Sequence, residues 1–95
     1  MRRAGKTDLT QVAIVKALRD IGASVQVLSA VGQGVPDLLA GWRGKVNVLL
    51  EVKTGNGKLT EEQVRWHSKW AGQVAVVNNA EDAIIQVLRA AGEGD

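Results

Sequence analysis

The fold is decided by residues 34–53, which read GVPDLLAGWRGKVNVLLEVK. Two apolar runs, 36–42 and 46–52, flank a tight turn at 41–45 that contains Gly41 and Gly44. Apolar runs of this length, joined by a short glycine-containing turn, are typical of an antiparallel β-hairpin. Pro36 fits the first position of a strand, where its missing N–H is tolerated. We therefore predict two paired strands at the centre of the domain.

The sequence on either side of this hairpin predicts further helices and strands. Before it, residues 7–21 repeat apolar side chains at helical spacing, residues 24–29 alternate as a strand does, and residues 30–35 form a loop. After it come a loop at 54–58, a helix that Thr60 caps and that runs to residue 71, a buried strand at 74–77, and an amphipathic helix from 80 to 91. The order α-β-β-β-α-β-α predicts one α/β domain, residues 1–95, built round a mixed central sheet flanked by helices.

Composition excludes several classes of site. Cysteine is absent, which rules out disulfides and thiolate metal ligands, and the single histidine, His67, argues against zinc. A bound metal would therefore be a hard ion held by oxygen. No apolar run approaches the roughly 18 residues of a membrane span, and no signal-peptide core follows the Arg-rich start, so we expect a soluble, cytoplasmic protein. The net charge of +2 is weak evidence for a nucleic-acid partner.

Two carboxylates occupy positions where a carboxylate is costly. Asp37 interrupts the first apolar run of the hairpin and Glu51 the second. Neighbouring strands can bring two such side chains close together on one face, where they repel each other unless a cation lies between them. Lys53 follows Glu51 by two residues and shares its face of the strand. The alternative is that Asp37 is a turn residue and that Glu51 and Lys53 form an ion pair on an edge strand.

A longer string, residues 34–70, resembles the signature of the PD-(D/E)XK nuclease superfamily. More narrowly, it is similar to the virus-type replication-repair nuclease (VRR-NUC) domain in the minimal, stand-alone form found in phages. The matching residues are Gly34, Pro36, Asp37, Glu51, Val52, Lys53, Lys58, Leu59 and Gln63. The short strings PD and EVK are common alone, but their combination with the downstream glutamine and the order of elements is specific. The resemblance spans essentially the whole chain, because the helix before this string and the strand and helix after it also fit, and it implies a restriction-endonuclease-like fold.

The resemblance also implies roles for individual residues. Asp37 and Glu51, helped by the backbone carbonyl of Val52, would bind Mg²⁺ or Mn²⁺. Lys53 would either position or deprotonate the attacking water, or stabilise the transition state. Gln63 would belong to the active-site motif, although Thr60 and Gln63 also have the spacing of a helix capping box.

Other residues on the two helices have two interpretations each. Members of the superfamily often carry an acidic metal ligand on the first helix, and the candidate here is Asp8, unless Asp8 is the N-cap of that helix and pairs with Gln11. His67, as the only histidine, is a candidate base, but its helical position between Trp66 and Trp70 favours packing or contact with a phosphate. Trp66 and Trp70 are expected to pack on the sheet as core residues.

Basic residues are candidates for contact with DNA. Arg43 and Lys45 lie at the hairpin turn, where a solvated turn is the alternative, and Lys58 and Arg65 follow the second strand. Arg2, Arg3 and Lys6 form a further cluster at the start of the chain.

The resemblance implies a metal-dependent DNA endonuclease that is selective for branched DNA such as four-way (Holliday) junctions. We expect it to act as a homodimer and, if phage-encoded, in the cytoplasm of a bacterial host. The alternatives are a catalytically inactive DNA-binding module of the same fold and a monomeric nicking nuclease. A small-molecule enzyme is disfavoured because the sequence has no phosphate-binding glycine loop of a known spacing and no nucleophile–base pair.

Overall fold

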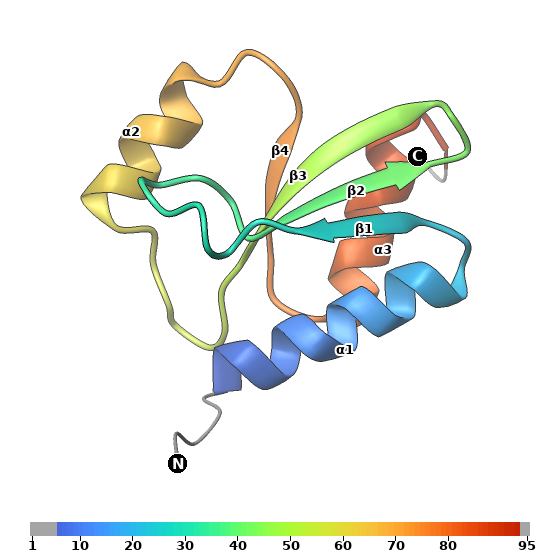
Figure 1. Ribbon diagram of the computed structural model, residues 1–95, viewed down its shortest axis with the longest axis horizontal. Coiled ribbons are helices and arrows are strands. Elements are labelled where there is room, and N and C mark those ends of the chain that lie inside the picture. The colour runs from blue at the N-terminus through green and yellow to red at the C-terminus, as the bar shows by residue number, and fades with distance from the viewer. Residues whose placement is uncertain (1–5, 94–95) are drawn as a thin grey trace.

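A computed structural model describes residues 6–93 and shows the predicted order of elements (Figure 1). The elements are α1 (Lys6–Asp20), β1 (Ser24–Val27), β2 (Leu38–Trp42), β3 (Val46–Val52), α2 (Glu61–Lys69), β4 (Val74–Val77) and α3 (Ala80–Ala90). No helix within these residues has the length and hydropathy needed to cross a membrane.

The four strands form one mixed sheet in the order β1-β2-β3-β4. The β1–β2 and β2–β3 pairs are antiparallel, whereas β3 and β4 are parallel and are joined through α2. The predicted hairpin is confirmed, with Leu38 opposite Leu50 and Trp42 opposite Val46. A parallel pair needs a long crossover connection, and the segment containing α2 supplies it.

The first strand of the hairpin starts two residues later than predicted, so Pro36 and Asp37 precede β2. The reason lies in the hydrogen bond at the end of β3. The N–H of Val52 donates to the carboxylate of Asp37 at 2.8 Å, so a side chain takes the place of a backbone partner there. The N–H of Leu28 in turn donates to the backbone carbonyl of Asp37 at 2.7 Å, just beyond the end of β1.

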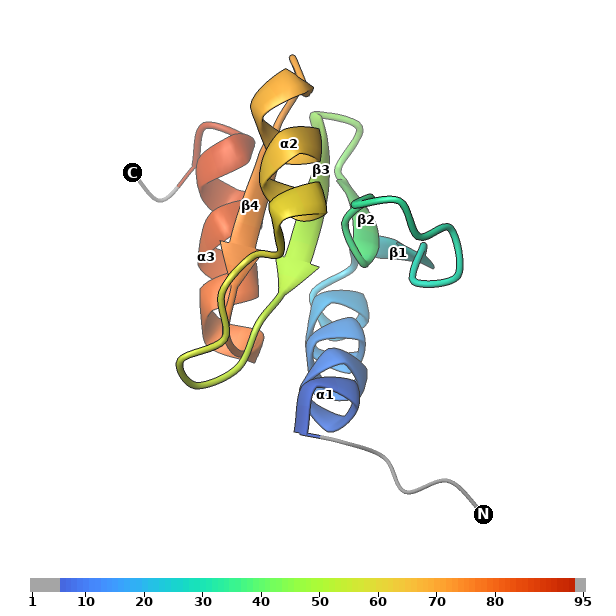
Figure 2. The ribbon, with the colours of Figure 1, turned by 90° about the vertical axis from the view of Figure 1, so that its left-hand side faces the viewer.

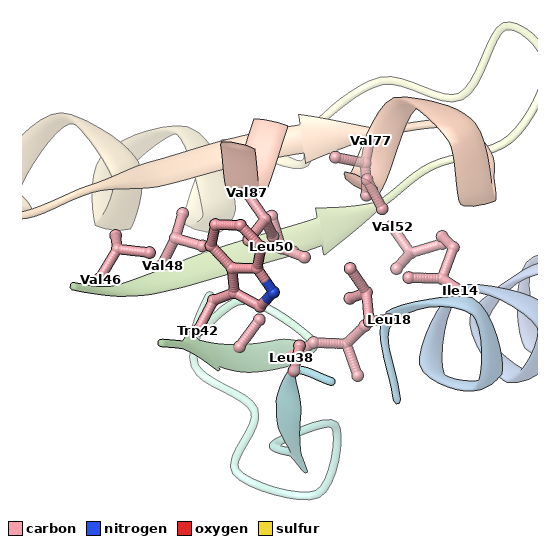
Figure 3. Close-up of a cluster of buried hydrophobic side chains, with 13 residues drawn as sticks. Ile14, Leu18, Leu38, Trp42, Val46, Val48, Leu50, Val52, Val77 and Val87 are labelled. Atoms are coloured by element: carbon pink, nitrogen blue, oxygen red, sulfur yellow. The ribbon is translucent and has the colours of Figure 1, made fainter. Parts of the chain in front are cut away.

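The hydrophobic core lies on one face of the sheet, against α1 and α3 (Figure 3). Alternate residues of the two central strands point to this face, which follows from the two-residue period of a strand. Ile14 and Leu18 from α1 and Ala83 and Val87 from α3 pack against these strand residues. The strand residues of the core are Leu38, Ala40, Trp42, Val46, Val48, Leu50, Val52 and Val77. Glu51 and Lys53 alternate with the core residues Leu50 and Val52, so their side chains project to the other face of the sheet.

Strand β4 is less buried than predicted. Val77 is fully buried, but Val76 is 41 % exposed. The strand occupies an edge of the sheet, and its outer face is left largely uncovered by the described residues. The run of valines indicated a strand correctly, but it did not show that the strand would lie at an edge.

Helix α2 stands apart from α1 and α3 (Figures 1 and 2). It contains no buried residue, so the prediction that Trp66 and Trp70 are core residues is wrong. The two indoles stack on each other instead, with centroids 4.8 Å apart, and Trp70 is 46 % exposed. The backbone at Gly34, with φ +84°, packs directly beneath this helix. A Cβ there would lie 2.7 Å from the carbonyl oxygen of Glu62.

Candidate active site

Asp37 lies where the loop before β2 meets the end of β3. The register pairs Leu38 with Leu50, and continuing it by one residue places Asp37 opposite Glu51. Residues directly opposite in an antiparallel pair project to the same side of the sheet. The half-buried Asp37 therefore faces the side of the sheet that carries Glu51, and its hydrogen bond to the N–H of Val52 fixes it there.

Glu51 is the only buried charged residue among those described, with 2 % of its surface exposed. The pKa of Glu51 is raised from its ordinary value of 4.5 to about 8. The largest cause is burial, followed by a hydrogen bond with Asp37 and the negative charge of Asp37, whereas Lys53 opposes the shift. Glu51 Oε2 accepts a hydrogen bond from Gln63 Nε2 at 3.3 Å. Glu51 Oε1 is buried without a hydrogen-bond partner among residues 6–93.

This arrangement suits a small divalent cation. Two carboxylates compete for one space, and an added positive charge would relieve both the burial of Glu51 and its repulsion by Asp37. Both carboxylates are oxygen donors, which Mg²⁺ and Mn²⁺ accept. Within residues 6–93, no group of three or more His, Cys, Asp or Glu side chains could hold a metal. An ion would thus rely on two carboxylates, backbone oxygen and water, which is how Mg²⁺ is usually held.

The backbone of Val52 is oriented for such a role. In a strand, the N–H and the C=O of one residue point to the same side. The N–H of Val52 points to Asp37, so its carbonyl also faces that side.

Lys53 follows on the same face as Glu51, at the end of β3. Its side chain is half-buried, and its charge lowers the pKa of both Glu51 and His67. An ammonium group therefore lies within electrostatic reach of the carboxylate pair.

A comparison with solved structures agrees with this geometry. A structure described as a VRR_NUC domain is similar to this chain, with a TM-score of 0.74 and 28 % sequence identity over 88 % of this chain and 96 % of the other. This chain has the fold of a VRR-NUC domain. The restriction-endonuclease-like architecture expected from the sequence is thereby confirmed. The chain matches no protein-family model and no curated protein sequence.

On this VRR-NUC fold, Gln63 caps α2 and also contacts Glu51. Its backbone N–H donates to Thr60 Oγ1 at 3.2 Å and its Oε1 accepts from the backbone N–H of Thr60 at 2.9 Å, which completes the capping box. The amide nitrogen of the same side chain, Nε2, donates a hydrogen bond to Glu51 Oε2 at 3.3 Å. One amide side chain thus caps α2 and ties that helix to the candidate site.

His67 was not among the site residues predicted from the sequence, yet it lies at the site. Its Nε2 is 3.8 Å from Glu51 Oε1, and its imidazole is largely buried. Burial lowers the pKa of His67, and the charge of Lys53 lowers it further. The signal that could have found it is its spacing, because His67 follows Gln63 by four residues and shares its face of the helix.

The first helix only partly follows the predictions. Because α1 includes Lys6 and Thr7, Asp8 lies inside its first turn, and the N-cap pairing of Asp8 with Gln11 is ruled out. Gln11 Oε1 instead accepts a hydrogen bond from Ser29 Oγ at 3.3 Å. The start of α1 does approach the loop after Lys53, since Thr7 Oγ1 and Thr54 Oγ1 are 3.2 Å apart. Asp8 itself is exposed, and its role as a metal ligand stays a prediction.

The basic residues fall into two groups. Arg43 and Lys45 lie at the far end of the hairpin, beyond the five residues of β2, which span roughly 17 Å at about 3.3 Å per residue. There Arg43 and Lys45 pair with Glu93 at 3.7 and 2.9 Å, and Arg43 stacks over Trp42. Lys58 and Arg65 are exposed on the loop before α2 and on α2, the helix that also carries Gln63 and His67. Arg2 and Arg3 lie outside the described residues.

Proposed function

We propose that this protein is a divalent-metal-dependent DNA endonuclease. The observation that carries the proposal is the convergence of Asp37, Glu51 and Lys53 at one end of the central hairpin, with Glu51 buried and one of its oxygens unpaired. A structural role alone does not account for a buried carboxylate held against a second carboxylate, because that arrangement destabilises the charged form of Glu51. The structural similarity to a VRR-NUC domain independently supports a nuclease function.

Asp37 and Glu51 would hold the ion, with the backbone carbonyl of Val52 as a third donor. The ion would supply Lewis acidity, which neutralises charge on the scissile phosphate and lowers the pKa of a nearby water. Asp37 is kept in place by the N–H of Val52, and Glu51 by Gln63. The protein's part is thus to fix two oxygen donors before the substrate arrives.

Lys53 would act on the attacking water or on the negative charge that develops at phosphorus. Both roles require a cation or amine beside the carboxylate pair, and the position of Lys53 two residues after Glu51 provides it. Mg²⁺ and Mn²⁺ both match the oxygen donor set, so both are suitable ions for testing the reaction.

The substrate we propose is branched DNA, in particular a four-way junction cut by a homodimer. Symmetric incision of two opposed strands needs two active sites related by a twofold axis, which a dimer of a one-site domain supplies. An apolar surface is present for such an interface. Leu9, Val12, Val27 and Val31, from α1, β1 and the loop after β1, are all exposed. Val12 and Val27 line one groove between α1 and the edge strand β1.

The experiment that tests this proposal is a cleavage assay on labelled duplex, flap, splayed-arm and four-way junction substrates, each with Mg²⁺, with Mn²⁺ and with chelator. We expect paired incisions across the junction that depend on the added ion. Metal-dependent cleavage of single strands in a duplex, by a monomer, would favour a nicking nuclease instead. Binding without any cleavage would indicate an inactive DNA-binding module.

A further inference from the structure

Two side chains of α2, Gln63 and His67, face the same buried carboxylate. Gln63 Nε2 donates to Glu51 Oε2 at 3.3 Å, and His67 Nε2 lies 3.8 Å from Glu51 Oε1. The two residues are four apart on the helix, so they lie on one face of it, one above the other. Each oxygen of Glu51 is therefore approached by a nitrogen from the same helix.

The second of these approaches is incomplete. Both His67 Nε2 and Glu51 Oε1 are buried and have no hydrogen-bond partner among residues 6–93. A charge-assisted hydrogen bond between nitrogen and a carboxylate oxygen is about 2.8 Å long, so a movement of roughly 1 Å would form it. A charged carboxylate oxygen can only accept, so the imidazole nitrogen must be the donor.

We propose that His67 is a positioning residue for the ion site: its Nε2–H holds Glu51 Oε1 while Gln63 holds Glu51 Oε2. The inference rests on the proposed function, because it concerns the orientation of Glu51 toward an ion shared with Asp37. A carboxylate has about four lone-pair positions, so two donors from α2 still leave positions that face Asp37. Partners that orient metal-binding carboxylates in this way commonly change metal affinity by 10- to 100-fold when they are removed.

The competing explanation is that His67 only packs in the half-buried space beneath α2. Its ring does meet Trp66 edge to face, with centroids 6.0 Å apart and an interplanar angle of 74°. Packing depends on the shape of the side chain and not on a donor at Nε2. Substitutions that separate shape from donor can therefore decide between the two roles.

The test compares His67→Leu, which keeps apolar bulk without a donor, with His67→Gln, which places an amide N–H near the position of Nε2. The exposed neighbour Ser68→Ala is the control. Mn²⁺ affinity is measured by titrating the protein and recording the electron paramagnetic resonance signal of the unbound Mn²⁺. Thermal unfolding is followed in parallel. We expect His67→Leu to weaken Mn²⁺ binding about tenfold or more. His67→Gln and Ser68→Ala should stay within about threefold of the unsubstituted protein. Equal weakening in the Leu and Gln variants, or unchanged binding in the Leu variant, would overturn the proposal.

A second measurement does not depend on metal. Nitrogen-15 spectra of the metal-free protein at about pH 9, where Glu51 is charged, report which ring nitrogen of His67 carries the proton. Protonated Nε2 is the expected result, and an unprotonated Nε2 would refute the contact. This result stands even if His67→Leu fails to fold. Absence of Mn²⁺ binding in the unsubstituted protein would instead refute the proposed function, so the two failures can be told apart.

Discussion

At the scale of single residues, Glu51 is the most informative side chain. It is buried beside a second carboxylate, and its pKa rises from 4.5 to about 8 for that reason. The folded protein therefore binds a proton at Glu51 that the unfolded chain releases between these two values. At neutral pH this uptake of a proton lowers the stability of the fold, and a bound ion that takes the place of the proton would relieve the cost.

The first prediction follows from the sign of this shift. Between pH 4.5 and about 8 the folded state holds the proton more tightly, so the free energy of unfolding contributed by Glu51 falls as the pH rises. The fall is at most roughly 1.4 kcal/mol per pH unit. The lowered pKa of His67 acts in the opposite direction at lower pH, up to its ordinary value of 6.5, so the range from about 7 to 8 isolates Glu51. Urea unfolding without metal should show the fall in the unsubstituted protein and a flatter profile in Glu51→Gln. Identical profiles would show that Glu51 is not the group responsible.

A second prediction concerns Lys53. Its ammonium group is not a metal ligand, so Lys53→Gln should lose cleavage by about a hundredfold or more and still bind Mn²⁺. Lys53→Arg keeps the positive charge but cannot act as a base. Cleavage that survives in the Arg variant assigns Lys53 to stabilising negative charge, and cleavage lost there assigns it to the water. Calorimetric titration checks the binding, and complete loss of Mn²⁺ binding in a folded Lys53→Gln protein would contradict this division of roles.

Sequence alone could place most of the candidate site, for a physical reason. Glu51 lies on β3, Lys53 directly after β3 and Asp37 directly before its partner β2, so the two-residue period of a strand fixes which of them share a face. Gln63 follows from the helix-capping pattern. The position of His67 depends instead on how close α2 comes to the sheet, and local patterns do not specify that distance.

At the scale of the elements, the contact between α2 and the loop before β2 connects the fold to the site. Periodicity identified both the helix and the strands, because those patterns depend on neighbours in sequence. It could not show that the apolar face of α2 would stay half-exposed or that β4 would lie at an edge. Those features depend on which other elements cover them, and Trp66, Trp70 and Val76 are the residues that reveal it.

The third prediction tests this contact with a pair of glycines. Gly34 and Gly32 both have positive φ, +84° and +72°, but only Gly34 meets neighbouring atoms, the carbonyl oxygen of Glu62 at 2.7 Å and Cβ of Trp66 at 3.0 Å. Gly32→Ala should cost about 1–2 kcal/mol of stability from its backbone conformation alone. Gly34→Ala should cost roughly 1–3 kcal/mol more through the collision, and it should also slow cleavage by moving α2. Urea unfolding and cleavage rates measure both effects, and equal losses in the two variants would argue against a close α2 contact.

At the scale of the whole molecule, the hairpin separates two kinds of charge. Its site end carries Asp37 and Glu51, and its turn carries Arg43 and Lys45, which Glu93 partly neutralises. With a net charge of only +2, a single copy has little electrostatic attraction for a duplex. Two copies would double the number of contacts to phosphate, so the proposed dimer also bears on DNA affinity.

The fourth prediction concerns this assembly. Val12 is 67 % exposed on the apolar surface of α1, and Val64 is 51 % exposed on α2. Val12→Glu should convert the dimer into a monomer because it buries an unpaired charge at the interface, whereas Val64→Glu should leave the dimer intact. Light scattering at micromolar concentration measures the mass directly. A monomeric unsubstituted protein, or a Val12→Glu protein that remains a dimer, would contradict this account of the interface.

The most direct test of the central claim is the rate at which the protein cuts a labelled four-way junction in Mg²⁺, before and after Asp37→Asn. Asparagine keeps a side-chain oxygen to accept the N–H of Val52, which Asp37 binds at 2.8 Å, so the fold should be retained. It removes the negative charge that would hold the ion. We predict cleavage by the unsubstituted protein that stops when the ion is chelated, and a rate at least about a thousandfold lower in a folded Asp37→Asn protein. A folded Asp37→Asn protein that cuts at the unsubstituted rate, or cleavage that continues in chelator, would contradict the account.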